Sequence, residues 1–75
     1  MRYRDGKNVC LGDQLLLKNG TKGRVVCLIG ENEYSAGYQS KDWSYLEQGA
    51  LILFEDPGIA HFLELDDQIM LISRK

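Results

Sequence analysis

Residues 15–26 read LLLKNGTKGRVV, in which two apolar runs are separated by the dipeptide Asn19-Gly20. Asn-Gly between two apolar runs is the strongest short-range signal for a β-hairpin, because both central residues of a type I′ turn need positive φ angles. A two-residue turn of this kind would pair Lys18 with Thr21. A slipped register, or a bulge at Gly23, is an equally good solution, since a glycine inside a strand often marks one.

The rest of the chain repeats this pattern of short apolar runs between turns that contain glycine. Each run has the length of a typical strand and is too short for an average helix, so an all-β fold is indicated. Several runs are apolar on both alternating faces, which predicts strands that are covered on both sides or that curl into a barrel. We expect strands over residues 14–17, 24–29, 50–54, 59–63 and 68–73.

Five short strands with one longer connection, between the second and the third, predict a small five-stranded SH3-like barrel. The stretch Gly12-Asp13-Gln14-Leu15, followed by Gly23-Arg24-Val25-Val26, resembles the opening of KOW-type and other SH3-like barrels. Within the long connection, residues 40–49 are the only helical candidate, one or two turns long, with Ser40 as N-cap and Gly49 at the end. No internal repeat, low-complexity tract or linker divides the chain, so residues 1–75 are expected to form a single domain.

Charge is distributed unevenly along the chain, although the formal net charge is only −2. Residues 1–30 hold six basic and two acidic residues, a balance of +4, whereas residues 31–67 hold nine acidic residues and Lys41, a balance of −8. A nucleic-acid-binding domain usually presents a strongly basic face to the phosphates. The acidic middle of the chain therefore favours a basic protein as the partner and disfavours nucleic acid.

Aromatic residues are concentrated in the same acidic region, since four of the seven lie within residues 34–45. Tyrosine and tryptophan are enriched in binding hot spots, and carboxylates beside them would speed the encounter with a basic target. The alternative is structural: Trp43 and Tyr45 would fold back to close one open end of the barrel. The candidate partner-binding residues are Glu31, Glu33, Tyr34, Tyr38, Asp42, Trp43 and Tyr45.

The chain offers no recognisable catalytic or metal-binding constellation. The single histidine, His61, is expected to be a hydrogen-bonded, half-buried strand residue, and the adjacent Asp66 and Asp67 would point in different directions from an extended chain. Cys10 and Cys27 lie among apolar neighbours and are expected to be reduced core thiols. We therefore expect a non-enzyme without metal or cofactor, and the lack of a secretory signal or membrane-spanning run indicates the cytoplasm.

A wider resemblance covers roughly residues 1 to 50. It includes the W-x-Y-L-x-x-G pattern of residues 43–49 and the shorter stretches Tyr3-Arg4-Asp5-Gly6, Gly12-Asp13, Gly23-Arg24-Val25-Val26, Glu33-Tyr34 and Tyr38. Together these stretches resemble small, single-domain bacterial proteins of toxin–immunity loci, including those of type VI secretion effectors. The resemblance implies a cytoplasmic inhibitor that neutralises a cognate toxin, such as a nuclease, by occluding its basic active-site cleft.

Two other functions stay open. A KOW or SH3-like nucleic-acid or ribosome-associated module would use the basic residues of the N-terminal part. A self-associating module would use the Tyr- and Trp-rich connection as a homodimer seam, and a monomer or weak homodimer is the expected oligomeric state. The basic residues in question are Arg2, Arg4, Lys7, Lys18, Lys22 and Arg24.

Overall fold

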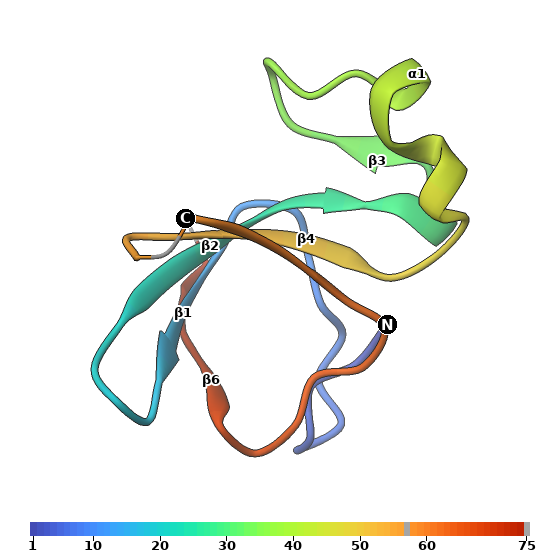
Figure 1. Ribbon diagram of the computed structural model, residues 1–75. Coiled ribbons are helices and arrows are strands. Elements are labelled where there is room, and N and C mark those ends of the chain that lie inside the picture. Colours follow the sequence, from blue (N-terminus) through green and yellow to red (C-terminus); the bar gives the residue numbers. More distant parts are fainter. Residues whose placement is uncertain (57, 75) are drawn as a thin grey trace.

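A computed structural model describes residues 1–56 and 58–74, and shows six antiparallel strands in one strongly curled sheet (Figure 1). The strand order is β5-β4-β2-β1-β6, and the short strand β3 pairs with the end of β2. The last strand, β6, thereby lies beside the first. The strands are β1 (Asp13–Leu17), β2 (Lys22–Leu28), β3 (Glu33–Tyr34), β4 (Ala50–Phe54), β5 (Ile59–Phe62) and β6 (Ile69–Arg74).

All five predicted runs form strands close to their expected bounds, so the all-β prediction is confirmed. The two-residue strand β3 was not predicted, and it makes the sheet six-stranded and not five-stranded. Across the described residues, the edge strands β5 and β6 do not pair with each other, so the sheet is not closed into the expected barrel.

The first hairpin adopts the slipped register and not the two-residue turn. The Leu17 N–H donates to the Thr21 carbonyl at 2.8 Å, which leaves a three-residue loop over residues 18–20. Two local preferences explain this loop: Gly20 takes a positive φ of 92°, and the Asn19 side chain accepts the Thr21 N–H at 2.9 Å. A three-residue loop that ends in a left-handed glycine is the next commonest hairpin connection after the two-residue turns.

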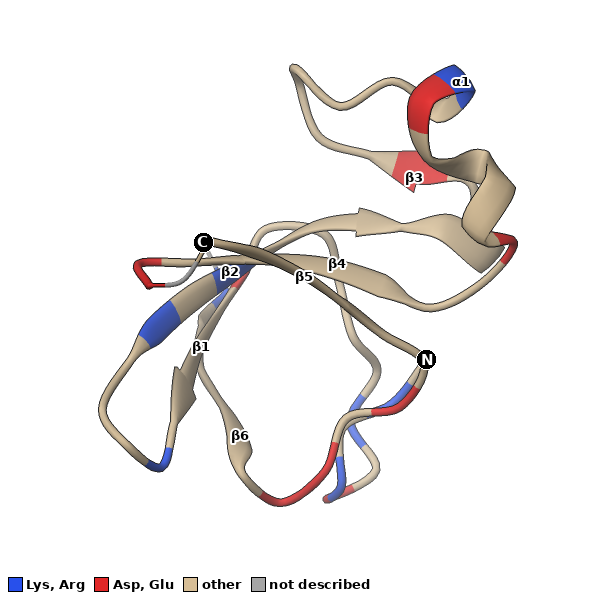
Figure 2. Ribbon diagram, in the orientation of Figure 1, with Lys and Arg blue, Asp and Glu red and all other residues tan. Residues whose placement is uncertain are grey.

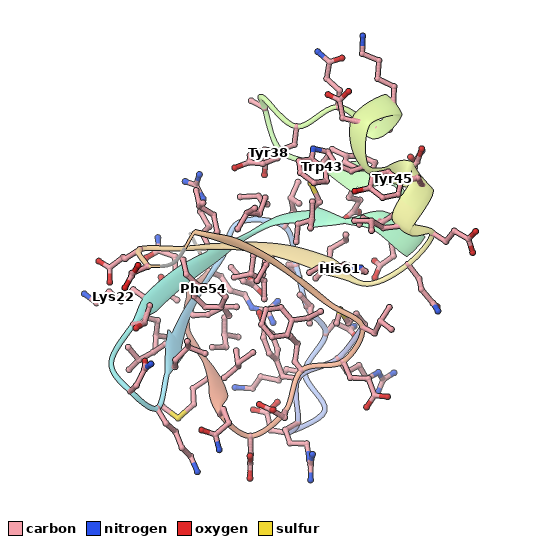
Figure 3. All side chains as sticks on the ribbon, in the orientation of Figure 1. Lys22, Tyr38, Trp43, Tyr45, Phe54 and His61 are labelled. Carbon is pink, nitrogen blue, oxygen red and sulfur yellow. The ribbon has the colours of Figure 1, made fainter. Side chains whose placement is uncertain are left out.

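Alternation along the strands gives the sheet an inner and an outer face, and the inner face carries the main core. The ring of Phe54 lies against the backbone of Gly23 and meets Phe62 edge-on, with 6.0 Å between the ring centroids (Figure 3). Leu15, Val25 and Ile52 are fully buried in this core. The inner cluster consists of Tyr3, Val9, Leu15, Val25, Leu28, Ala50, Ile52, Phe54, Leu65 and Ile69.

A second apolar cluster lies on the outer face, at the end of β2. An extra residue in β2 shifts its register against β4, so that Val26 and Cys27 both join this cluster together with Ile29 and Leu51. The end of β2 is therefore covered on both faces, as its uninterrupted apolar sequence predicts. The residues that cover the outer cluster are Tyr34, Tyr38, Trp43 and Leu46.

Besides β3, the connection between β2 and β4 contains three short helical pieces, η1 (Ile29–Glu31), α1 (Ser40–Trp43) and η2 (Ser44–Leu46). The predicted helical stretch is confirmed, but Ser40 is its first residue and not its N-cap, which is Gln39 without a side-chain hydrogen bond. The stretch ends at Glu47, where φ is +70°, and not at Gly49. Within the described part of the chain, no helix is long and apolar enough to cross a membrane.

Candidate partner-binding surface

The seven predicted partner-binding residues all lie on one segment, residues 29–49, which we call the protrusion. It leaves the sheet at the end of β2, and its strand β3 and helix α1 stand above the sheet before the chain returns into β4 (Figure 1). Pairing of β3 with β2 holds its base in place. Glu31 lies in η1, Glu33 and Tyr34 form β3, Tyr38 lies in the following loop, Asp42 and Trp43 belong to α1, and Tyr45 belongs to η2.

Three of the four rings of the protrusion attach it to the sheet. Tyr34, Tyr38 and Trp43 are half-buried and pack on the outer cluster, and the rings of Tyr38 and Trp43 are tilted at 42° with centroids 6.5 Å apart. Figure 3 shows these two rings between the α1 segment and strand β2. The expected plug at an open barrel end is therefore wrong for Trp43, which covers the outer face of the sheet.

Tyr45 is the ring that faces away from the sheet, with 72% of its surface exposed. It follows Trp43 by two residues in a tight helical stretch, so the two side chains leave the backbone in different directions. The neighbouring side chains hold this segment in place. An exposed tyrosine on such a segment can contact another macromolecule through both its apolar ring and its hydroxyl. Tyr45 is thus not part of a plug either.

Carboxylates surround this ring in the sequence, and all of them are exposed. Glu33, Asp42 and Glu47 carry exposed side chains, and Glu31 is also exposed, although its Oε2 lies 3.1 Å from the amino group of Met1. With Lys41 as the single basic residue, the protrusion has a formal charge of −3. Figure 2 shows acidic positions on β3, on α1 and at the turn into β4.

Two polar contacts of the outer face were only partly foreseen. His61 is hydrogen-bonded, with Nε2 2.8 Å from the Gln48 carbonyl oxygen at the base of the protrusion, but its side chain is exposed and not half-buried (Figure 3). Cys27 is fully buried under the aromatic cover. Burial raises the pKa of its thiol, and a hydrogen bond with the Ser35 backbone acts in the opposite direction.

Cys10 lies elsewhere and is only half-buried, so the core position expected for both thiols applies fully to Cys27 alone. The Cys10 Sγ accepts a hydrogen bond from Arg74 Nη1 at 3.0 Å. Both cysteines are free thiols. Among the described residues, no three His, Cys, Asp or Glu side chains are grouped as ligands of a metal ion.

The basic residues expected for nucleic-acid binding do not form one surface. Arg2 belongs to a small bridge with Asn8 near the N-terminus, whereas Lys22 and Arg24 lie on β2. Figure 2 shows these two groups at separate places, and acidic positions are interspersed near the N-terminus. Comparison with models of known protein families, with curated proteins and with solved structures gave no match.

Proposed function

We propose that this chain is a non-enzymatic binding domain of the immunity type, whose protrusion occupies a basic cleft on a protein partner. The exposure of Tyr45 among exposed carboxylates carries the proposal. Tyrosine is a frequent hot-spot residue because it combines a large apolar area with a polar tip. In this arrangement Tyr45 enters an apolar pocket of the partner, while Glu33 and Asp42 meet its lysines or arginines.

The fixed attachment of the protrusion supports this role. A loop that is free in solution loses conformational entropy when it binds, and that loss weakens the complex. Here Tyr38 and Trp43 pack on the sheet, and β3 pairs with β2, so much of the ordering is complete before the partner arrives. The negative charge of the protrusion adds a faster encounter with a positively charged partner.

The strand order favours the SH3-like scaffold that the sequence predicts. Apart from β3, the strands β1, β2, β4 and β5 lie in sequence order as neighbours, and β6 returns to pair with β1. We infer from this order an SH3-like arrangement. We propose separately that the protein is cytoplasmic and monomeric or weakly dimeric. Inhibition would be steric and electrostatic, because the partner, a toxin such as a nuclease, would find its cleft filled by carboxylates in place of its substrate.

Capture of the partner from cells that express the chain tests the proposal. The immobilised wild-type protein is expected to retain a basic protein, and the double variant Glu33→Lys with Asp42→Lys to lose it. The matched control, Glu64→Lys with Asp67→Lys, changes the net charge equally at exposed positions outside the protrusion and should capture as wild type does. Capture that survives the first double variant, or retention of nucleic acid alone, would contradict the proposal.

A second measurement addresses the inhibitory step. The captured protein, expressed alone in a bacterial host, is expected to arrest growth, and co-expression of the wild-type chain should restore it. Tyr45→Ala should weaken that rescue without changing stability, because the side chain makes little contact with the core. A captured protein that does not harm the host would leave a binding domain but remove the immunity function.

A further inference from the structure

The outer face of the sheet is covered only in part. The protrusion covers the end of β2, whereas the remaining part bears two hollows of about 350 Å³ and 470 Å³. Gln14 and Arg24 line both hollows, which are therefore adjacent parts of one surface region between the β4–β5 turn and the loop at residues 35–36. We call it the outer groove, and its lining residues are Leu11, Gly12, Gln14, Lys22, Gly23, Arg24, Ser35, Ala36, Leu53 and Glu55.

Strand register places one row of side chains across the sheet face that bears this groove. Ser73, Gln14, Arg24, Leu53 and Ile59 are successive cross-strand partners on β6, β1, β2, β4 and β5. Directly opposed residues point to the same face of a sheet, so the row carries one cation next to two aliphatic side chains. Leu53 and Ile59 are 38% and 41% exposed, which leaves apolar area beside the guanidinium.

Among the described residues, the two cations of the groove have no acidic ion-pair partner. Lys22 and Arg24 are exposed, and neither forms an ion pair with a carboxylate of residues 1–56 or 58–74. Glu55 is the acidic residue of the lining, and its Oε1 accepts the backbone N–H of Lys22 at 3.1 Å. By contrast, Arg74 at the sheet edge has Nε 3.8 Å from Asp13 Oδ1.

We propose that the outer groove binds an extended acidic peptide segment of a partner protein, with carboxylates at alternate positions. Lys22 and Arg24 are two residues apart on one strand, so their side chains leave the same face about 7 Å apart. Alternate side chains of an extended peptide have the same spacing, which lets two successive carboxylates meet the two cations. Leu53, on the neighbouring strand β4, then lies beside the methylene groups of those acidic side chains, because the intervening side chains of an extended peptide point away from the groove.

A polyphosphate backbone fits the groove less well. No aromatic ring lines the groove among the described residues, so bases would have no stacking partner. The groove is also opposite in charge to the protrusion, so the two surfaces would take different partners or different parts of one partner.

Fluorescence anisotropy with a labelled peptide of sequence GEVEVEVEG tests the proposal. The wild-type protein is expected to bind this peptide, and to bind it more weakly at high salt. It should not bind GQVQVQVQG, in which each glutamate is replaced by the neutral glutamine. Lys22→Glu with Arg24→Glu should weaken binding at least tenfold, whereas Arg2→Glu with Lys18→Glu, an equal charge change outside the groove, should leave it unchanged. Near-UV circular dichroism identifies any variant that has lost its fold, and Arg24→Gln then serves as the milder substitute.

Three outcomes would overturn the proposal. The first is equal binding by wild type and the groove variant, or no binding even at low salt. The second is tighter binding of a single-stranded oligonucleotide than of the acidic peptide, which would assign the groove to nucleic acid. The third is concentration-dependent self-association in sedimentation that the groove variant abolishes, which would make the protrusion of a second copy the occupant. Because Glu33 and Asp42 are unchanged in the groove variant, failure here leaves the proposed function untouched.

Discussion

The hydroxyl of Tyr3 donates a 2.6 Å hydrogen bond to the carboxylate of Asp13, whose residue is only 1% exposed. The same carboxylate oxygen accepts the Cys10 N–H at 2.9 Å, and Arg74 approaches its other oxygen. The network therefore joins residues 1–10 to strands β1 and β6. Burial, and the hydrogen bond to Asp13, raise the pKa of the Tyr3 hydroxyl well above its ordinary value.

This raised pKa predicts a specific loss of stability in base. A group whose folded-state pKa is higher than its unfolded value stabilises the fold fully below the unfolded pKa, about 10 for tyrosine, and loses that contribution as pH rises toward the folded value. Tyr3→Phe is expected to lower the free energy of unfolding at pH 7 by about 1.5–3 kcal/mol, as for a hydrogen bond to a charged group. The difference from wild type should shrink above pH 10 in urea titrations.

Tyr45→Phe is the matched control, because it removes an exposed phenol from the same chain. Its difference from wild type should be small at pH 7, and the same urea titrations measure it at each pH. The Cys27 thiol, whose pKa is also raised, is present in all three proteins and cancels in the comparison. A Tyr3→Phe difference that stays constant through pH 11 would show that the hydroxyl is not held as described.

Close contact with Phe54 predicts that Gly23 cannot be replaced without loss. A Cβ at this position would lie 2.5 Å from Phe54 Cδ1 and 3.1 Å from Ile52 Cγ2, and both side chains are buried. Gly23→Ala is therefore expected to lower the free energy of unfolding by about 1–3 kcal/mol, as overpacking does. Denaturant midpoints provide the measurement.

Gly30→Ala tests whether the contact, and not glycine itself, causes that loss. The nearest atom to its Cβ would be Gln48 Cβ at 3.6 Å, an ordinary contact. Its effect is expected to stay within about 0.5 kcal/mol. The double variant Gly23→Ala with Phe54→Leu should lose less free energy of unfolding than the sum of the losses in the two single variants. Strict additivity of the two losses would count against the contact.

The strands could be predicted because the signals are local. Runs such as Ala50–Phe54 are apolar and bounded by turn residues, and both-face coverage of β2 follows from its uninterrupted apolar sequence. The candidate site residues could also be predicted to lie on one surface, because they are close together in the sequence and belong to a single protrusion. Which of its rings would attach and which would be exposed was not predictable, since Trp43 and Tyr45 differ only in the direction taken from a short helical stretch.

The remaining features depend on which residues pair with each other, and the sequence pattern of a single segment does not determine that pairing. Strand β3 has only two residues, Glu33 and Tyr34, and forms through its pairing with β2. The outer groove exists because Arg24 faces Leu53 across twenty-nine positions of sequence, a pairing that no local pattern encodes. Even the hairpin register was ambiguous, because the Asn19 side chain competes for a backbone N–H and so selects the longer loop.

The three-residue loop predicts that different substitutions of its glycine, Gly20, will reduce stability by different amounts. Gly20 has a φ of +92°, and a Cβ added there would meet no atom of the described residues within 4 Å, so only backbone strain opposes substitution. Gly20→Ala is expected to lower the free energy of unfolding by about 1–2 kcal/mol, and Gly20→Asn by less, because asparagine visits the left-handed region more readily. Thermal unfolding of the pair checks this, and equal losses would contradict the strain explanation.

Burial of Cys27 under the rings of the protrusion provides a direct readout of their attachment. Trp43→Ala removes the largest side chain of that cover. We expect the free energy of unfolding to fall by about 2–4 kcal/mol. This loss is near the lower end for truncations of large core side chains, because Trp43 is half-buried. In a Cys10→Ser background, the reaction of Cys27 with a thiol reagent such as DTNB should accelerate at least tenfold.

Tyr45→Ala separates attachment from recognition in the same assay. Its side chain is 72% exposed, so stability is expected to change by less than about 0.5 kcal/mol and the Cys27 thiol should stay as protected as in wild type. Binding to the captured partner should nevertheless fall, because this ring is the one presented outward. If instead Tyr45→Ala exposes the thiol while Trp43→Ala does not, the roles of the two rings are reversed and the recognition surface must be reassigned.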